Sequence, residues 1–134
     1  MTSINLQIHN ITQTLVVENN GRDLDFSMPN LEWIYNMTVQ NVSSLETPTL
    51  SHVNASLSLY GNSISQYESP LLQSIGGTLA VDGNAYLRNI TLPSLQNIGG
   101  GLWLNDNTNL TLVNQIEALT TVGGNVQING TIAE

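Results

Sequence analysis

The sequence predicts an all-β solenoid of about five to six rungs, a parallel β-helix or leucine-rich-repeat-like fold. The first observation is an apolar-x-apolar triplet that recurs along the whole chain of 134 residues. The triplets are Leu15/Val17, Met37/Val39, Leu57/Leu59, Leu79/Val81, Leu102/Leu104 and Val126/Ile128. They begin 22, 20, 22, 23 and 24 residues apart. A repeat of this length is typical of solenoids, in which each rung adds one short strand to a parallel sheet.

The second observation is an apolar pair, three residues apart, that precedes each new triplet. The pairs are Leu31/Ile34, Leu50/Val53, Leu72/Ile75, Leu95/Ile98 and Leu119/Val122, and the first four are preceded by Pro29, Pro48, Pro70 and Pro93. This spacing fits one short helical or 3₁₀ turn on the side away from the triplet sheet. The Gly-Gly pairs that follow also suit β-hairpin turns. The solenoid is favoured because Pro-x-Leu-x-x-Ile lacks the alternation of a strand.

From the N-terminus, the alternating segment from Ile4 to Ile11 predicts a strand and a partial first rung. An asparagine follows most triplets, and these residues are expected to turn the chain and stack as a hydrogen-bonded ladder: Asn19, Asn41, Asn62, Asn84 and Asn107. The glycines Gly76-Gly77, Gly99 to Gly101 and Gly123-Gly124 indicate corners that need positive φ or close backbone approach.

Two columns of side chains are expected on the outer face of the triplet sheet, because alternate residues of a strand point to opposite faces. The Thr38 column comprises Val16, Thr38, Ser58, Ala80, Trp103 and Gln127. The Gln40 column comprises Glu18, Gln40, Tyr60, Asp82, Asn105 and Asn129. Truncation of the inward Leu79 or Leu102 is expected to cost stability, whereas Ala80 and Gln127 are expected to tolerate substitution.

The composition argues against several classes of function. The formal net charge is −8, with ten acidic residues, two arginines and no lysine. A nucleic-acid partner needs Lys and Arg for its phosphates, and an anionic membrane surface needs them too. The absence of cysteine excludes disulfides, Cys-based zinc sites and thiol nucleophiles. No apolar run reaches the length of a membrane span, and no signal peptide opens the chain.

Seven Asn-x-Ser/Thr sequons are the clearest signal outside the core. They are Asn10, Asn36, Asn41, Asn54, Asn89, Asn109 and Asn129. Each predicts a surface glycan if the chain passes through the secretory pathway. The alternative is that an Asn- and Thr-rich surface produces such matches by composition.

The remaining candidates for chemistry are few. Tyr60 and Trp103 could stack on a sugar or peptide, with Asp82 and Asn105 as hydrogen-bonding partners, although aromatic residues on a sheet face also simply pack on their neighbours. Asp23 and Asp25 alternate without a nearby His or Lys base. His9 and His52 lack the spacing of metal ligands. We therefore expect no catalytic residues, no metal and no cofactor, and the chain is predicted not to be an enzyme.

One pattern carries a family resemblance. Leu-x-x-Ile-Gly-Gly-x-Leu-x-Val-x-Gly-Asn, followed by Leu-x-x-Ile-x-Leu-Pro-x-Leu, runs from Leu72 to Leu95, and parts of it recur as far as Val122. It is similar to the fungal glycosylphosphatidylinositol (GPI)-anchored cell-wall proteins with receptor-L-domain-like leucine-rich repeats, the extracellular-mutant/sporulation-specific family. The match is close from Leu57 to Gly101 and looser from Leu15 to Asn54, where Gly-Gly is missing.

The resemblance implies an extracellular, N-glycosylated protein of the cell surface or cell wall that contributes to wall organisation and integrity. It implies cell-wall polysaccharide, neighbouring wall proteins, adjacent solenoid repeats or a second L domain as partners, and a membrane only through a lipid anchor. A carbohydrate- or peptide-binding module on the Tyr60 and Trp103 face is the alternative. Family members carry a signal peptide, a Cys-bearing part, a Ser-rich stalk and an anchor-directing tail, which this sequence lacks. We therefore expect residues 1–134 to form one receptor-L-domain-like domain from a fragment or a truncated member.

Overall fold

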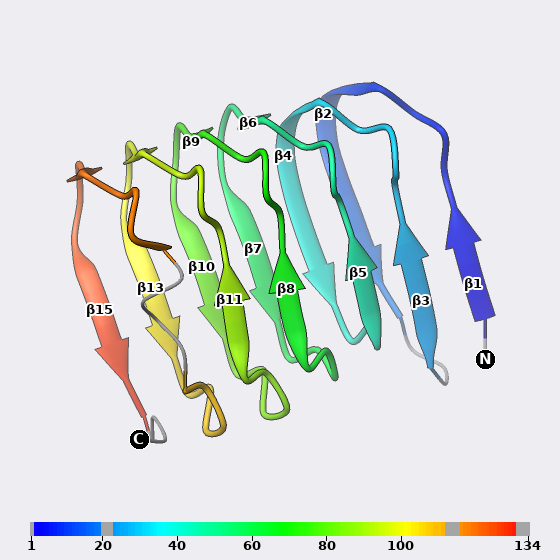
Figure 1. Cartoon of the computed structure of the whole chain (residues 1–134). Helices are drawn as coiled ribbons and strands as arrows, with labels where there is room; N and C mark the ends of the chain where they lie inside the picture. The colour runs from blue at the N-terminus through cyan, green and yellow to red at the C-terminus, as the bar shows by residue number, and fades with distance from the viewer. Residues whose placement is uncertain (1, 20–22, 112–115, 131–134) are drawn as a thin grey trace.

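The computed structural model describes residues 2–19, 23–111 and 116–130. The chain winds through about six rungs into a β-solenoid, with β1 at one end of the stack and β15 at the other (Figure 1). Every strand pair is parallel. The predicted all-β solenoid is confirmed, and the hairpin alternative is wrong.

The strands form two layers with the core between them (Figure 1). The main sheet contains β2 (Asn10–Glu18), β4 (Trp33–Gln40), β7 (Leu57–Tyr60), β10 (Leu79–Asp82), β13 (Leu102–Asn105) and β15 (Val126–Asn129), together with the short strands β6 (His52–Val53), β9 (Ser74–Ile75), β12 (Asn97–Ile98) and β14 (Thr121–Val122). The second layer contains β1 (Thr2–Asn5), β3 (Leu24–Ser27) and β5 (Ser44–Glu46) in one sheet, and β8 (Gln66–Glu68) and β11 (Asn89–Thr91) in another. No helix in the described part of the chain is long and apolar enough to cross a membrane.

The register of the main sheet confirms both predicted outward columns. Thr38 pairs with Val16 on one side and Ser58 on the other, and the column continues through Ala80 and Trp103 to Gln127. The Gln40 column is aligned in the same way, from Glu18 to Asn129. The inward triplet residues of the central rungs are buried, whereas Val126 and Ile128 in β15 are 55% and 49% exposed.

The expected tolerance of Ala80 is not supported. Ala80 lies on the outer face, but only 1% of its surface is exposed, and Ser58 beside it is also buried. Its register partners on that face are Ser58 and Trp103. Strands in a sheet lie about 4.8 Å apart, so a small side chain between two neighbours loses its contact with water. A larger residue at position 80 is therefore expected to disturb the packing of Ser58 and Trp103.

The predicted asparagine ladder forms in the three central rungs. Asn62, Asn84 and Asn107 are buried. Each side-chain Oδ1 accepts a backbone N–H from the rung before it, from Val42 at 3.0 Å, Asn62 at 2.9 Å and Asn84 at 3.1 Å respectively. Each Nδ2 donates to a strand carbonyl of the preceding rung, at 3.1, 3.0 and 2.7 Å. The ladder thus satisfies the buried backbone groups where the strands end.

Asn19 and Asn41 lie outside this buried ladder, contrary to the prediction. Asn41 is exposed and has a φ of 59°. It therefore occupies the position of Gly61 and Gly83, whose φ values are 57° and 66°. Asn41 Nδ2 donates to the carbonyl of Asn19 at 2.5 Å, and Asn19 Nδ2 donates to the carbonyl of Asn41 at 3.1 Å. Asparagine and aspartate tolerate the left-handed region better than most residues, which explains Asn41 here and Asp106, with a φ of 57°, after β13.

The Gly-Gly corners are places of close backbone approach. A Cβ at Gly99 would collide with the carbonyl oxygen of Gly76, and a Cβ at Gly123 would collide with that of Gly99. None of these three glycines has a positive φ, so contact between successive rungs is the reason for glycine here. Where Gly-Gly is missing, β2 and β4 run through the corner as strands of nine and eight residues.

At the four pairs that follow a proline, the predicted helical or 3₁₀ turns are instead β-turns followed by a strand, whereas Ile116, just before the fifth pair, has 3₁₀ geometry. The N–H of Leu50 donates to the carbonyl of Thr47 at 3.3 Å, and Pro48 occupies the second position of the turn. The same bond closes the turns that end at Leu31, Leu72 and Leu95. Val53 then lies in β6, and Ile75 and Ile98 lie in β9 and β12. Proline presets the φ of this turn position, and the strand lets the second apolar residue point inward.

The ladder predicts the cost of removing one of its members. Asn84→Ala removes the acceptor of the Asn62 N–H and the side-chain donor to the Leu59 carbonyl. We expect the free energy of unfolding to fall by about 2–4 kcal/mol in chemical denaturation. The matched control is Asn97→Ala, because Asn97 is exposed on β12. Equal losses in the two variants would contradict a stabilising role for the ladder.

Candidate functional site

The outer face of the main sheet brings together three of the four predicted ligand residues. Tyr60, Asp82 and Asn105 are register partners on β7, β10 and β13, so they form one continuous column. Trp103 lies in the neighbouring column on the same face, two residues before Asn105. All four side chains are half-buried. Their proximity is set by backbone pairing, which makes this a rigid surface.

Trp103 is held against its own strand. The indole Nε1 is buried, and among the described residues it has no hydrogen-bond partner. A Cβ at Gly101 would lie 2.6 Å from that Nε1 and 2.9 Å from the carbonyl oxygen of Asn125. The third glycine of the Gly99 to Gly101 run therefore makes room for the indole, which leaves Trp103 less available to a ligand than the sequence indicates.

Asp82 and Asn105 are coupled across the two strands. The backbone N–H of Asn105 donates to Asp82 Oδ1 at 3.2 Å. Burial raises the pKa of the Asp82 carboxyl above its usual value, and the negative charge of Asp106 raises it further, while hydrogen bonds from Asn105 lower it. Asn105 Oδ1 is buried without a partner in the described part of the chain. The face therefore offers hydrogen-bonding groups for hydroxyls or amides.

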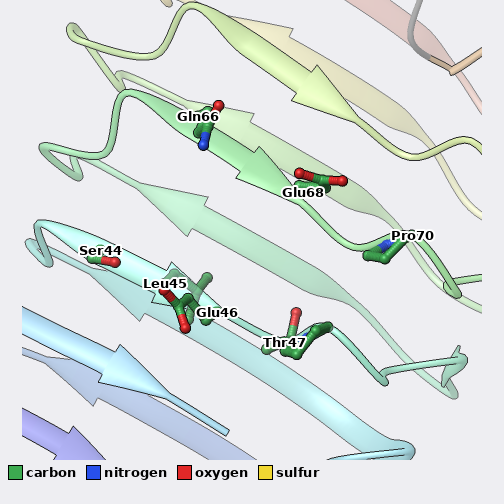
Figure 2. A pocket seen from close by; sticks show the side chains of 8 residues that line it. Ser44, Leu45, Glu46, Thr47, Gln66, Glu68 and Pro70 are labelled. Atoms are coloured by element: carbon green, nitrogen blue, oxygen red, sulfur yellow. The ribbon is translucent and has the colours of Figure 1, made fainter. Parts of the chain in front are cut away.

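A second candidate site, which the sequence reasoning missed, lies where the second layer is interrupted. β5 pairs only with β3, and β8 pairs only with β11, so β5 and β8 do not form a ladder. A cleft of about 350 Å³ opens between them. Figure 2 shows Ser44 and Glu46 on β5 facing Gln66 and Glu68 on β8, with Pro70 at one end.

The cleft follows from an unequal rung length. Three residues separate Gln40 at the end of β4 from Ser44 at the start of β5. In the later rungs, five residues separate Tyr60 from Gln66 and six separate Asp82 from Asn89. The shorter connection carries β5 away from the register that β8 and β11 share. The interval of 20 residues from Met37 to Leu57 was the available signal, because every other interval is longer.

A buried hydroxyl cluster lies beneath the cleft, and Thr47 is the member of this cluster that lines it. The Tyr67 hydroxyl lies 2.9 Å from Thr47 Oγ1, and Ser69 Oγ donates to the carbonyl of Thr47 at 3.0 Å. Burial raises the pKa of the Tyr67 hydroxyl, while the hydrogen bonds with Thr47 and Ser69 lower it. Glu46 and Glu68 are exposed at the rim. The rim carboxylates can accept hydrogen bonds from water or from hydroxyls, and among the described residues no hydrogen bond joins Ser44 or Thr47 to Glu46 or Glu68.

The asparagines of the seven predicted sequons differ in whether their side chains form hydrogen bonds within the protein. Asn36 Oδ1 accepts the N–H of Ser56 at 2.9 Å, and Asn109 Nδ2 donates to the carbonyl of Ala85 at 2.6 Å. Asn41 bonds to Asn19. The other four make no side-chain hydrogen bond within the described residues: Asn10, Asn54, Asn89 and Asn129. Glycosylation of any of the seven stays a prediction.

The weak catalytic and metal candidates stay apart. Asp23 accepts a hydrogen bond from Ser43 Oγ at 3.3 Å. His52 on β6 and Ser74 on β9 are register partners in the main sheet, and His52 Nδ1 lies 2.9 Å from Ser74 Oγ. Among the residues that the structure describes, no group of three His, Asp or Glu side chains is placed to hold a metal ion. No arrangement at these positions resembles an acid–base or nucleophilic centre.

Comparison with known proteins finds fungal relatives. The chain is 32% identical over 123 residues to Sporulation-specific protein 2 of Saccharomyces cerevisiae, which covers 92% of this chain and 24% of that protein. It is 34% identical over 121 residues to a cell surface GPI-anchored protein of Arthroderma benhamiae, covering 90% and 31%. It is 30% identical over 102 residues to Protein ecm33 of Aspergillus fumigatus, covering 75% and 25%. No family model and no solved structure matches the chain.

The chain is homologous to fungal GPI-anchored cell-wall proteins. The resemblance carried by the Gly-Gly and Leu-Pro-x-Leu motifs is thereby confirmed, and so is the predicted localisation at the cell surface or cell wall. The chain spans between 24% and 31% of the length of these three homologues. The assignment as a receptor L domain stays a prediction.

The pKa of Asp82 predicts how stability changes with pH. The folded state binds the Asp82 proton more tightly than the unfolded chain, because the pKa is raised on folding. The favourable contribution is present below the unfolded pKa of about 3.9, and it is lost as the pH rises through the folded pKa. Asp82→Asn should therefore melt at a higher temperature than wild type at neutral pH, and this gain should shrink at about pH 3. Thermal melts at the two pH values measure it, and an equal or lower melting temperature at neutral pH would contradict it.

Proposed function

We propose that this chain is a non-enzymatic structural part of a fungal cell-surface glycoprotein that contributes to cell-wall organisation and integrity. The observation that carries the proposal is how the polar side chains are used. In the central rungs the buried asparagines form hydrogen bonds from one rung to the next, so their side-chain amides hold the stack together. A rigid rod with a polar surface that carries few charged residues suits a scaffold.

Two further observations support a scaffold. Surface charge is sparse, since only 9% of the residues are charged and the net charge is −8, which disfavours nucleic acid as a partner. The candidate acids and histidines are dispersed over the two layers. One homologue is described as a cell surface GPI-anchored protein, so we propose that the whole protein reaches the membrane only through a lipid anchor and meets wall polysaccharide, other wall proteins or further solenoid repeats.

The second candidate function is a carbohydrate- or peptide-binding module on the outer face of the main sheet. It is supported by the alignment of Tyr60, Asp82 and Asn105 in one column and by the unpartnered Oδ1 of Asn105. The packing of Trp103 over Gly101 weakens the case for a binding module, because the indole already contacts its own chain.

A complementation experiment tests the scaffold and separates it from the binding module. We expect a fungus that lacks the full-length protein to grow poorly with a dye that perturbs the cell wall, and wild-type protein to restore growth. Tyr60→Ala/Trp103→Ala should also restore growth, because a scaffold does not need this face. The matched control is Tyr35→Ala, an exposed aromatic residue on β4. Unchanged growth of the deletion strain would contradict the proposal.

The two functions also differ in direct binding. We expect wild-type protein and Trp103→Ala to give the same weak signals on an array of cell-wall glycans. Release of reducing ends from wall polysaccharide should not rise above the level of a blank. A glycan bound by wild type and lost in Trp103→Ala would favour the binding module, and steady release of reducing ends would show an enzyme.

A further inference from the structure

A hollow of about 250 Å³ lies at the side of the solenoid where β10 connects to β11. It is lined by Ser65, Gln66, Tyr86, Arg88, Asn89 and Asn109. It lies away from the outer face of the main sheet and adjoins the cleft between β5 and β8, with which it shares Gln66. Its lining combines one aromatic ring with amide, hydroxyl and guanidinium groups, which is a suitable environment for a sugar.

The hollow exists because neighbouring connections differ by one residue. Asn62 is separated from the buried Ile64 by one residue, whereas Asn84 is separated from the equivalent buried Leu87 by two. The extra residue makes a β-turn, closed by a hydrogen bond from the N–H of Leu87 to the carbonyl of Asn84 at 3.1 Å. Tyr86 stands in this turn and has no counterpart in the preceding connection, so the space beside its ring is open.

Tyr86 is conspicuous as an aromatic residue without a packing partner. It is 64% exposed, which is the largest exposure among the exposed large hydrophobic residues of the described chain. The turn that carries it is fixed on both sides. On the far side Asn109 Nδ2 donates to the carbonyl of Ala85 at 2.6 Å, and after the turn the N–H of Arg88 donates to the carbonyl of Ser65 at 2.8 Å. A rigid backbone thus holds an uncovered ring beside the hollow.

Asn89 supplies the attachment point. It begins the sequon Asn89-Ile90-Thr91, three residues after Tyr86, and it lines the same hollow. Its side chain makes no hydrogen bond with the described residues, whereas the other asparagine of the hollow, Asn109, uses its Nδ2 to hold Ala85. Ile90 is buried, so its neighbours Asn89 and Thr91 point outward from β11. The free Asn89 amide therefore lies where a sugar attached to it can reach the ring.

We propose that Asn89 carries an N-linked glycan whose first sugar packs on the ring of Tyr86 and fills this hollow. In the transfer, the Asn89 Nδ2 forms a bond to C1 of the sugar and gives up one proton. The bond between C1 and the phosphate oxygen of a lipid-diphosphate-linked oligosaccharide donor breaks, and the lipid diphosphate leaves. Arg88 and Gln66 then face the sugar hydroxyls as hydrogen-bonding groups. The inference rests on the proposed surface glycoprotein, because the chain must pass through the secretory pathway.

The test uses the full chain, secreted from a eukaryotic host. Peptide mass spectrometry before and after glycosidase treatment should find Asn89 occupied. Trimming the glycan to its first sugar should leave the stability unchanged. In that trimmed form, Tyr86→Ala should raise the unfolding equilibrium constant about fivefold, the size of an aromatic contact. In Thr91→Ala, which removes the sequon but keeps Asn89, the same Tyr86 substitution should have almost no effect.

Each result decides between distinct conclusions. Leu71→Ala is the matched control, because Leu71 is exposed apolar surface outside the hollow, and it should act equally with and without the glycan. An unoccupied Asn89, with occupied sequons elsewhere, overturns the inference and leaves the proposed glycoprotein standing. An equal effect of Tyr86→Ala in both backgrounds also overturns it. No occupied sequon in the secreted native protein would contradict the inference and the glycoprotein together.

Discussion

The contact between successive rungs is the constraint on which the rest of this structure depends. Parallel strands stack at about 4.8 Å, and at the ends of the strands the chain must turn without leaving buried backbone groups unpaired. Asn62, Asn84 and Asn107 meet that need with one acceptor and one donor each. At the other corner, glycines allow the carbonyl of one rung to lie where a Cβ would otherwise be. The chain has no disulfides. Its rungs are held together by the same two features in successive repeats, the asparagine ladder and the glycine corners.

Local departures from the repeat create the features that could carry function. The short connection from β4 to β5 interrupts the second layer and opens the cleft between β5 and β8. The extra residue before Leu87 lifts Tyr86 out of register and leaves a hollow beside Asn89. In both places the core beneath is unchanged, since Tyr67 and Leu87 stay buried. The stack therefore tolerates variation in its connections because its stability resides in the strands and the ladder.

Much of the fold can be predicted from the sequence, because the apolar positions of each repeat are the buried positions of each rung. The triplets gave the strands of the main sheet and both outward columns, since alternation along a strand is fixed by geometry. The helical expectation at Leu50/Val53 was wrong. A β-turn and a 3₁₀ turn both have a hydrogen bond from the N–H of residue i+3 to the carbonyl of residue i. Only the strand that follows the turn distinguishes them. Asn41 was placed one residue out of register because asparagine can occupy the position that Gly61 takes. The burial of Ala80 and the packing of Trp103 over Gly101 depend on neighbours in other rungs, which spacing alone does not reveal.

The most direct measurement of the central claim is native-state hydrogen exchange at the ends of the strands. The backbone amides of Asn62 and Asn84 are bonded to the side chains of the next rung. They should exchange only through global unfolding, at the same free energy as the amides of β7 and β10. The exposed Ala85, which follows Asn84 in the same connection, serves as the internal reference. Rapid exchange at Asn62 and Asn84, with β7 and β10 still protected, would show that the asparagine ladder does not hold the rungs together.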